Sequence, residues 1–207
     1  MRTVTKLEPY NSRIKVYLDD EFSFLLYKGE IRKFHLNENE SIGEDTYREI
    51  MESLYKRARE RVLYILDDSY KTESQIREKL NKGFYPPDIV DKVINYLIEY
   101  DLVNDLRYAG MYIEFKSSSK SKKQIVQDLY RKGVSKDNID AAFEESDYSD
   151  EISLYKIIEK RISKYNLNEQ QDLQKIYRYL IGKGYCYSDV KKALSKYTNI
   201  NQNRGQD

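Results

Sequence analysis

A Lys-Gly-apolar triplet that returns three times along the 207-residue chain constrains the fold more than any other feature. The triplets are Lys82-Gly83-Phe84, Lys132-Gly133-Val134 and Lys183-Gly184-Tyr185. Their glycines are 50 and 51 residues apart. Self-similarity at a period of this size indicates tandem copies of one supersecondary unit. The chain is therefore predicted to be an array of small units.

Each triplet follows a pair of apolar residues at i, i+4 spacing. The pairs are Ile76 and Leu80, Ile125 and Leu129, and Ile176 and Leu180. This spacing places both residues on one face of an amphipathic helix. Apolar segments further upstream (62–66, 108–113 and 154–158) and downstream of each glycine predict two more helices per unit. The unit is therefore expected to be a three-helix bundle that resembles a helix-turn-helix.

The triplets themselves predict the turn between the second and third helices of each unit. A glycine suits the left-handed position that closes a helix, and the next apolar residue packs back on the helix just ended. The expected structural anchors are Gly83, Phe84, Gly133, Val134, Gly184 and Tyr185. The first apolar pair lies one residue closer to its glycine than the other two pairs do, so that helix end is expected to differ locally.

The first 40 residues have a β-rich pattern instead. Residues 13–18 alternate polar and apolar side chains, and residues 22–26 follow after a polar connector, which is typical of a β-hairpin. Residues 4–7 supply a candidate third strand, because a small sheet needs about three strands to be stable. The predicted fold is mainly α, with three tandem three-helix repeats in a curved array after a small β-rich N-terminal region.

This pattern divides the chain into five segments. They are a β-rich region with a connecting helix (1–55), three helical repeats (56–103, 104–148 and 149–198) and a flexible tail (199–207).

Composition argues for a cytoplasmic protein. The N-terminus lacks the apolar segment of a signal peptide, and no run of about 18 apolar residues predicts a membrane span. Cys186 is the sole cysteine, which excludes an internal disulfide and fits a reducing compartment.

The sequence offers few residues for catalysis. His35 is the sole histidine, and its neighbours Phe34 and Leu36 favour a structural role. Cys186 is expected to be a small interior residue, and nothing in the sequence pairs it with His35. One histidine and one cysteine cannot form a zinc site, and Gly182-Lys183-Gly184 lacks the other residues of a P-loop. The chain is predicted to be no enzyme and to need no cofactor or metal.

The local charge pattern points to a binding function. Residues 107–136 carry eight Lys or Arg against two acids, whereas residues 137–151 carry seven acids and no Lys or Arg. A dense basic stretch beside a helix N-terminus favours a phosphate or an acidic protein surface, although a solvated linker is the alternative. The candidate partner-binding residues are Arg107, Lys116, Lys120, Lys122, Lys123, Arg131 and Lys132.

These features together resemble the RecX family of bacterial recombinase regulators over residues 57–197. The matching segments are QIREKLNKGF at 75–84, LVNDLRYA at 102–109, similar to the family's Leu-x-Asp-Asp-x-Arg-Phe-Ala, and KQIVQDLYRKGV at 123–134. Their order and spacing are specific. Asn104 departs from the family pattern, which has an acid at this position, and this affects expectations for the local geometry. The N-terminal region is similar to that of longer family members.

The resemblance implies a negative modulator of RecA. Such proteins bind in the groove of the RecA–DNA filament and inhibit its ATPase, strand-exchange and co-protease activities, by blocking extension or promoting disassembly. It also implies a role in DNA repair, recombination and the SOS response, with the RecA nucleoprotein filament as partner, possible weak DNA binding, no membrane contact and a monomeric state. The alternatives are a protein that binds DNA directly through its helix-turn-helix-like units and an enzyme with an unrecognised site.

Overall fold

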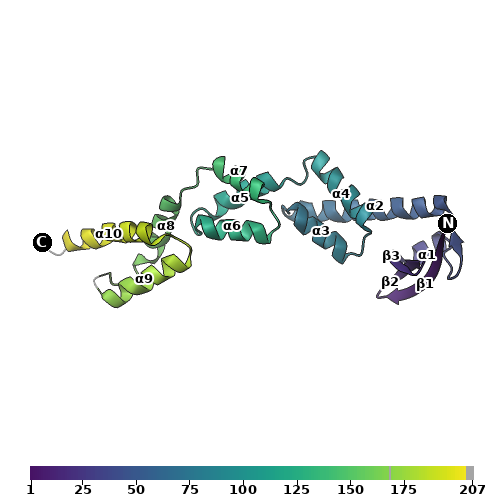
Figure 1. Ribbon diagram of the computed structural model, residues 1–207, viewed down its shortest axis with the longest axis horizontal. Helices are drawn as coiled ribbons and strands as arrows, with labels where there is room; N and C mark the ends of the chain where they lie inside the picture. The colour runs from purple at the N-terminus through teal and green to yellow at the C-terminus, as the bar shows by residue number, and fades with distance from the viewer. Residues whose placement is uncertain (168, 204–207) are drawn as a thin grey trace. The chain divides into compact units, whose positions relative to one another are not determined.

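A computed structural model describes residues 1–167 and 169–203, which form ten helices and four strands (Figure 1). The chain divides into two compact units, Met1–Asn104 and Asp105–Asp207. The chain is mainly helical, with a small antiparallel sheet at its N-terminus, as the sequence predicted.

The N-terminal sheet contains two consecutive hairpins. Its strands are β1 (Arg2–Tyr10), β2 (Arg13–Leu18), β3 (Glu21–Tyr27) and the short β4 (Ser41–Ile42), in the order β3-β2-β1-β4. All neighbours are antiparallel. Asn11, Asp19 and Asp20 adopt positive φ in the two turns, a conformation that Asn and Asp tolerate better than most residues. The predicted hairpin and third strand are confirmed.

Four helices complete the first unit: α1 (Lys28–Lys33), α2 (Glu44–Asp68), α3 (Glu73–Lys82) and α4 (Pro87–Glu99). The helix α2 is long because its buried residues, Ile50, Leu54, Ala58 and Val62, recur at spacing four without interruption. They belong to one hydrophobic core that includes residues of the sheet, α3 and α4. The predicted boundary between residues 55 and 56 therefore falls inside a continuous helix, and the sheet and the first repeat share one core.

The second unit holds the second and third repeats. The second repeat consists of α5 (Asp105–Lys116), α6 (Lys122–Arg131) and α7 (Lys136–Glu144), and the third of α8 (Asp150–Ile162), α9 (Gln170–Gly182) and α10 (Tyr187–Asn203). Each repeat buries its own apolar cluster. The helix α10 covers residues 199–203, which the sequence analysis assigned to a flexible tail, and residues 204–207 lie outside the described part of the chain.

Hydrogen bonds tie the second and third repeats together. The Ser121 hydroxyl, which caps α6, donates to the backbone carbonyl of Lys183 (2.5 Å). The backbone carbonyl of Lys120 accepts a hydrogen bond from the Ser153 hydroxyl of α8 (2.9 Å). Because buried polar groups need partners, these bonds fix the junction between the two repeats.

The repeated turn contains one correction. Gly133 (φ 83°) and Gly184 (φ 94°) adopt the predicted left-handed conformation. Gly83 does not, since its φ is −80°, and the left-handed residue of the first repeat is Phe84 (φ 60°). The prediction for Gly83 is therefore wrong.

The shorter first helix end explains this shift. The backbone N–H of Tyr85 donates to the Leu80 carbonyl, as Val134 does to Leu129 and Tyr185 to Leu180. Tyr85, Val134 and Tyr185 are all buried. Tyr85 therefore holds the anchor position that the sequence analysis gave to Phe84, and Phe84 stands where the other repeats have glycine.

Candidate functional site

All seven predicted partner-binding cations lie on α5, on α6 or on the residues that flank α6, and four of them form one cluster. Lys116, Lys120, Arg131 and Lys132 gather around Tyr112 and the carboxylate of Asp128. Tyr108 lies one helical turn before Tyr112, with the two rings stacked at 6.4 Å between centroids. These seven residues are called the α5–α6 basic surface below.

Asp128 is the centre of this surface. Its side chain is only 10% exposed. The carboxylate accepts a hydrogen bond from the Tyr112 hydroxyl (2.9 Å) and forms ion pairs with Lys120 and Arg131. Since one carboxylate neutralises only one of the four cations, the surface keeps a net charge of about +3.

The electrostatics of the cluster follow from burial and hydrogen bonding. Burial alone would raise the pKa of Asp128, but hydrogen bonds from Lys120 and Tyr112 and the nearby charges of Lys120 and Arg131 outweigh it, so that the pKa lies below 3.8. Burial and the hydrogen bond to Asp128 raise the pKa of Tyr112 to about 12. At neutral pH Asp128 is therefore ionised and Tyr112 is a hydrogen-bond donor.

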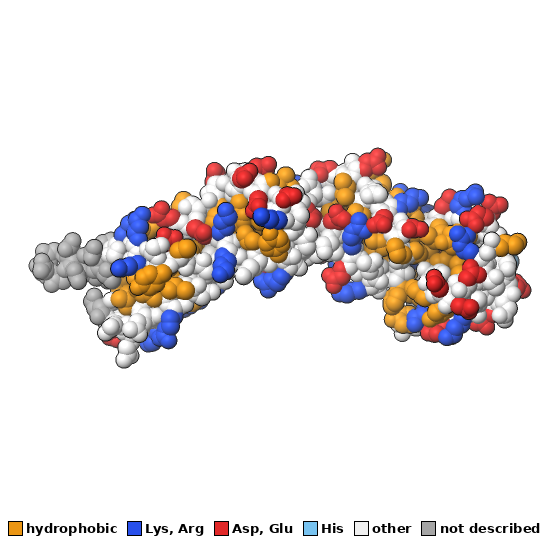
Figure 2. Space-filling view, in the orientation of Figure 1, with side chains coloured by type: hydrophobic (Ala, Val, Ile, Leu, Met, Phe, Trp, Pro, Cys, Tyr) orange, Lys and Arg blue, Asp and Glu red, His pale blue; other side chains and the backbone are white. Residues whose placement is uncertain are grey.

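The remaining cations of the surface, Lys116 and Lys132, lie over aromatic rings. The Lys132 ammonium lies 5.5 Å from the centroid of the Tyr112 ring, and the Lys116 ammonium lies 4.4 Å from that of Phe115. Phe115 is 75% exposed. In Figure 2, Lys and Arg side chains lie beside hydrophobic side chains over α6. This combination of apolar area and positive charge suits an acidic partner surface or a phosphate-bearing one.

The other three predicted cations, Arg107, Lys122 and Lys123, are also on α5 and α6 but are not part of this cluster. The Lys122 ammonium packs over the Phe143 ring of α7, 4.7 Å from its centroid. The Lys123 stem lies against the Gly184 turn of the third repeat. Arg107 is exposed on α5. Of the lysines at 116–123, Lys120 is paired with Asp128.

Sequence reasoning overlooked Tyr108, Tyr112 and Asp128. Two signals were available: the tyrosines are four residues apart on one helix, and Asp128 is three residues before Arg131 on another. Both spacings place side chains on the same helical face.

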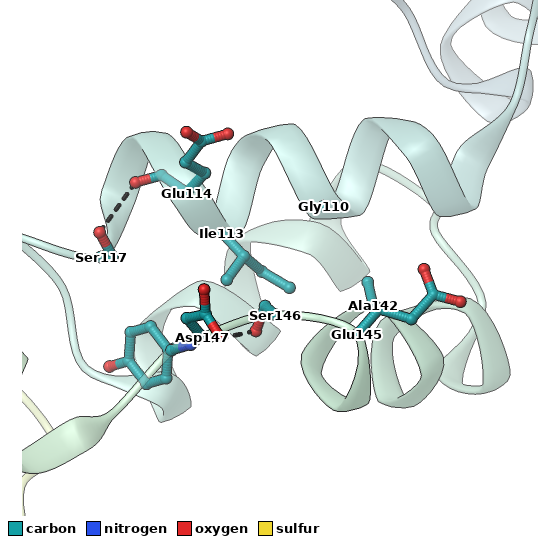
Figure 3. Close-up of a pocket in the computed structure, with 9 residues that line it drawn as sticks. Gly110, Ile113, Glu114, Ser117, Ala142, Glu145, Ser146 and Asp147 are labelled. Carbon is teal, nitrogen blue, oxygen red and sulfur yellow. Dashed lines mark hydrogen bonds between the residues drawn. The ribbon is translucent and has the colours of Figure 1, made fainter.

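A cavity of about 400 Å³ opens on another side of the second repeat, between α5 and α7 (Figure 3). Its lining includes Gly110 and Glu114 from α5 and Glu145, Asp147 and Tyr148 from the end of α7 and beyond. Among the residues that line it there is no Lys or Arg.

The two residues considered for catalysis belong to different units of the chain. Cys186 is exposed at the start of α10, so its prediction as an interior residue is wrong. His35 is exposed and belongs to the first unit, whereas Cys186 belongs to the second. Within residues 1–167 and 169–203, no three His, Cys, Asp or Glu side chains group to hold a metal ion. No helix in the described part of the chain is long and apolar enough to cross a membrane.

Comparison with protein-family models gives three consecutive matches. Residues 58–97 match the first three-helix domain of RecX, residues 104–142 the second and residues 150–194 the third.

Individual relatives and solved structures agree with these matches. The chain is 34% identical to regulatory protein RecX of Clostridium beijerinckii, covering 95% of this chain and 96% of the relative. It is 32% identical to RecX of Clostridium perfringens strain SM101, covering 91% of each. A crystal structure of regulatory protein RecX superposes with a TM-score of 0.62 at 22% identity, covering 94% of this chain and 100% of that chain. The structure of RecX from Lactobacillus salivarius gives 0.60 at 24% identity, covering 70% and 96%.

Proposed function

Because the chain belongs to the RecX family of regulatory proteins, we propose that it is a negative modulator of RecA. It binds in the groove of the RecA–DNA filament. There it inhibits the ATPase, strand-exchange and co-protease activities of the filament, by blocking extension or promoting disassembly. It does this without catalysis, as a monomer in the cytoplasm, and takes part in DNA repair, recombination and the SOS response.

The α5–α6 basic surface is the observation that supports this partner. A RecA–DNA filament presents phosphate groups and a protein surface, and a net charge of about +3 beside exposed aromatic area is complementary to acidic groups on either. Lys116 and Lys132 are assigned to direct contact, because their ammonium groups lie over rings at the surface. Lys120 is assigned to positioning, since it is only 30% exposed and pairs with Asp128.

The test is inhibition of the RecA ATPase on single-stranded DNA. The parent protein is expected to inhibit it. The double variant Lys116→Glu and Lys132→Glu is expected to inhibit about tenfold less well, because two contacts of about 0.2–1 kcal/mol each are lost together. Thermal unfolding should change little, since the ion pairs of Asp128 with Lys120 and Arg131 are left intact.

A matched control reverses two charges elsewhere. Lys28→Glu with Lys33→Glu changes two exposed lysines of the short helix α1 in the first unit. This control should inhibit as the parent does. Equal inhibition by both double variants would show that the partner does not bind at Lys116 and Lys132. No inhibition by the parent protein would contradict the proposed function itself.

Direct DNA binding is the second candidate, favoured by the same cations and by the exposed Phe115 ring. A protein that binds DNA through phosphates has an affinity for naked DNA that falls steeply with salt. Binding that requires RecA and nucleotide instead supports the filament. The two candidates are separated by measuring association with single-stranded DNA alone and with the assembled filament across a salt series.

A further inference from the structure

The first and third helices of each repeat meet along a seam, and the three seams can be compared position by position. The buried residue after each repeated turn, Tyr85, Val134 or Tyr185, provides the common origin. Eleven residues after these origins, the third helix or its C-cap carries Tyr96, Glu145 and Lys196, respectively.

The first and third seams are each occupied by a cation and a ring. In the first repeat the Arg59 guanidinium lies 5.3 Å from the centroid of the Tyr96 ring. In the third repeat the Lys196 ammonium lies 4.7 Å from the centroid of the Tyr155 ring. The helices that supply the cation and the ring are exchanged between the two repeats, but both seams contain the same kind of contact.

Among the residues that the structure describes, no cation lies over a ring between α5 and α7 in the second seam. Glu145 stands at the position of Tyr96 and Lys196, and Gly110 lines the opposite wall on α5 (Figure 3). A Cβ atom added to Gly110 would meet nothing within 4 Å. Seven residues after the common origin, Ala141 also replaces the lysines of the other repeats, Lys92 and Lys192. Gly110 and Glu145 both line the cavity of about 400 Å³ between α5 and α7.

The electrostatics of the cavity favour a positive occupant. Glu114, Glu145 and Asp147 line it, with no Lys or Arg among the lining residues. Glu145 caps the C-terminal end of α7, where the helix dipole adds negative potential. The Tyr148 ring forms part of the lining.

We propose that this cavity binds a Lys or Arg side chain of a protein partner, which supplies a cation to the seam between α5 and α7. The ammonium or guanidinium group pairs with an acidic side chain of the lining such as Glu145, and its stem fills the space beside Gly110. The identification of this partner as the RecA filament rests on the proposed function. The cavity and the α5–α6 basic surface then engage groups of opposite charge on that partner.

Two variants block the cavity in different ways. Gly110→Leu fills it with a side chain and also raises helix propensity, so the fold is retained. Glu145→Lys places an ammonium group at the seam position that Lys196 has in the third repeat. Each is expected to weaken binding to the RecA–DNA filament about tenfold or more, as measured by co-sedimentation.

Matched controls separate the cavity from general effects. Gly182→Leu makes the same substitution at another helical glycine with open space around it, and Glu144→Lys makes the same charge change at a neighbour that does not line the cavity. Both controls should bind within about twofold of the parent. The inference is overturned if Gly110→Leu and Glu145→Lys also bind the filament within twofold of the parent. It is also overturned if the two controls lose as much affinity as these two variants.

A second measurement does not depend on RecA. A peptide of four arginines is titrated into the parent protein and into Gly110→Leu, with a peptide of four glutamines as reference, while backbone amide shifts are followed by NMR. Saturable shifts at Gly110 and Glu145 in the parent alone support the cavity, even if the parent does not bind the filament and the proposed function fails. If the parent shows no such shifts and Gly110→Leu binds the filament as the parent does, this inference is contradicted while the proposed function stands.

Discussion

At the residue scale, Asp128 organises the α5–α6 basic surface. A buried carboxylate is unfavourable unless it is paired and hydrogen-bonded, and Asp128 has a hydroxyl and two cations as partners. Its charge holds Lys120 and Arg131 in place while the neighbouring lysines remain over aromatic rings. One acid within a basic stretch therefore positions the cations as well as reducing their net charge.

Asp128→Asn is expected to destabilise the protein by about 2 kcal/mol, because charge-assisted hydrogen bonds are lost and Lys120 keeps a half-buried charge without its counter-ion. The loss should depend on pH. Since the folded pKa lies below the ordinary value of 3.8, ionised Asp128 contributes fully above that value, and its contribution disappears as pH falls through the folded pKa.

Denaturant unfolding at a series of pH values between 2 and 7 measures both effects. The difference between the parent and Asp128→Asn should be largest near pH 7 and shrink below about pH 4. Asp137→Asn changes an exposed aspartate at the start of α7 and serves as the control. A pH-independent difference would show that the carboxylate charge is not what stabilises the cluster.

At the element scale, the repeated turn shows how the spacing between the last apolar helix residue and the glycine decides which residue adopts the left-handed conformation. Moving the glycine one residue closer to Leu80 leaves Phe84 in the left-handed conformation, which is costly for a residue with a side chain. The Phe84 ring makes edge-to-face contacts with Tyr10 (5.5 Å) and Phe22 (5.9 Å) of the sheet. These contacts compensate for the strain and link the first repeat to the sheet.

Three glycine-to-alanine substitutions should shift the thermal midpoint in different directions. Gly133→Ala is expected to destabilise by about 1–2 kcal/mol through its left-handed backbone. Gly184→Ala should destabilise more, since the new Cβ would also lie 3.1 Å from side-chain atoms of Ser121 and Lys123. Gly110→Ala should stabilise by about 0.5–1 kcal/mol, because it removes a flexible residue from a helix with open space beside it. Equal shifts for all three would contradict these assignments.

The elements themselves were predictable because they depend on local periodicity. The i, i+4 apolar pairs placed α3, α6 and α9, and the alternation at residues 13–18 placed β2. The left-handed residue of the first turn could not be predicted from the sequence. The triplet pattern matches Gly83 to the other two glycines, whereas the backbone hydrogen bonds match Tyr85 to Val134 and Tyr185. The ion pair of Lys120 with Asp128 could not be predicted from the sequence either, because it joins a loop to a helix and depends on packing between helices.

At the scale of the whole molecule, the hydrophobic cores define the independent parts. The sheet, α2, α3 and α4 contribute to a single core, whereas the second and third repeats each bury a separate cluster. Sequence reasoning placed a boundary near residue 55 because the β-rich pattern ends before it. It had no signal for the shared core, since Ile50, Leu54, Ala58 and Val62 continue one helical face across that point.

This shared core predicts how truncated chains behave. A fragment of residues 1–104 contains the whole first core and should unfold in one cooperative transition. A fragment of residues 56–104 loses Ile50, Leu54 and the sheet, leaving Ala58, Val62 and the α3–α4 residues without that side of their core, so it should not fold cooperatively. Circular dichroism melts of both fragments measure this, with residues 105–207 as a fragment that keeps both of its clusters. Cooperative melting of residues 56–104 would show that the first repeat is an independent domain and that the sheet is an appendage to it.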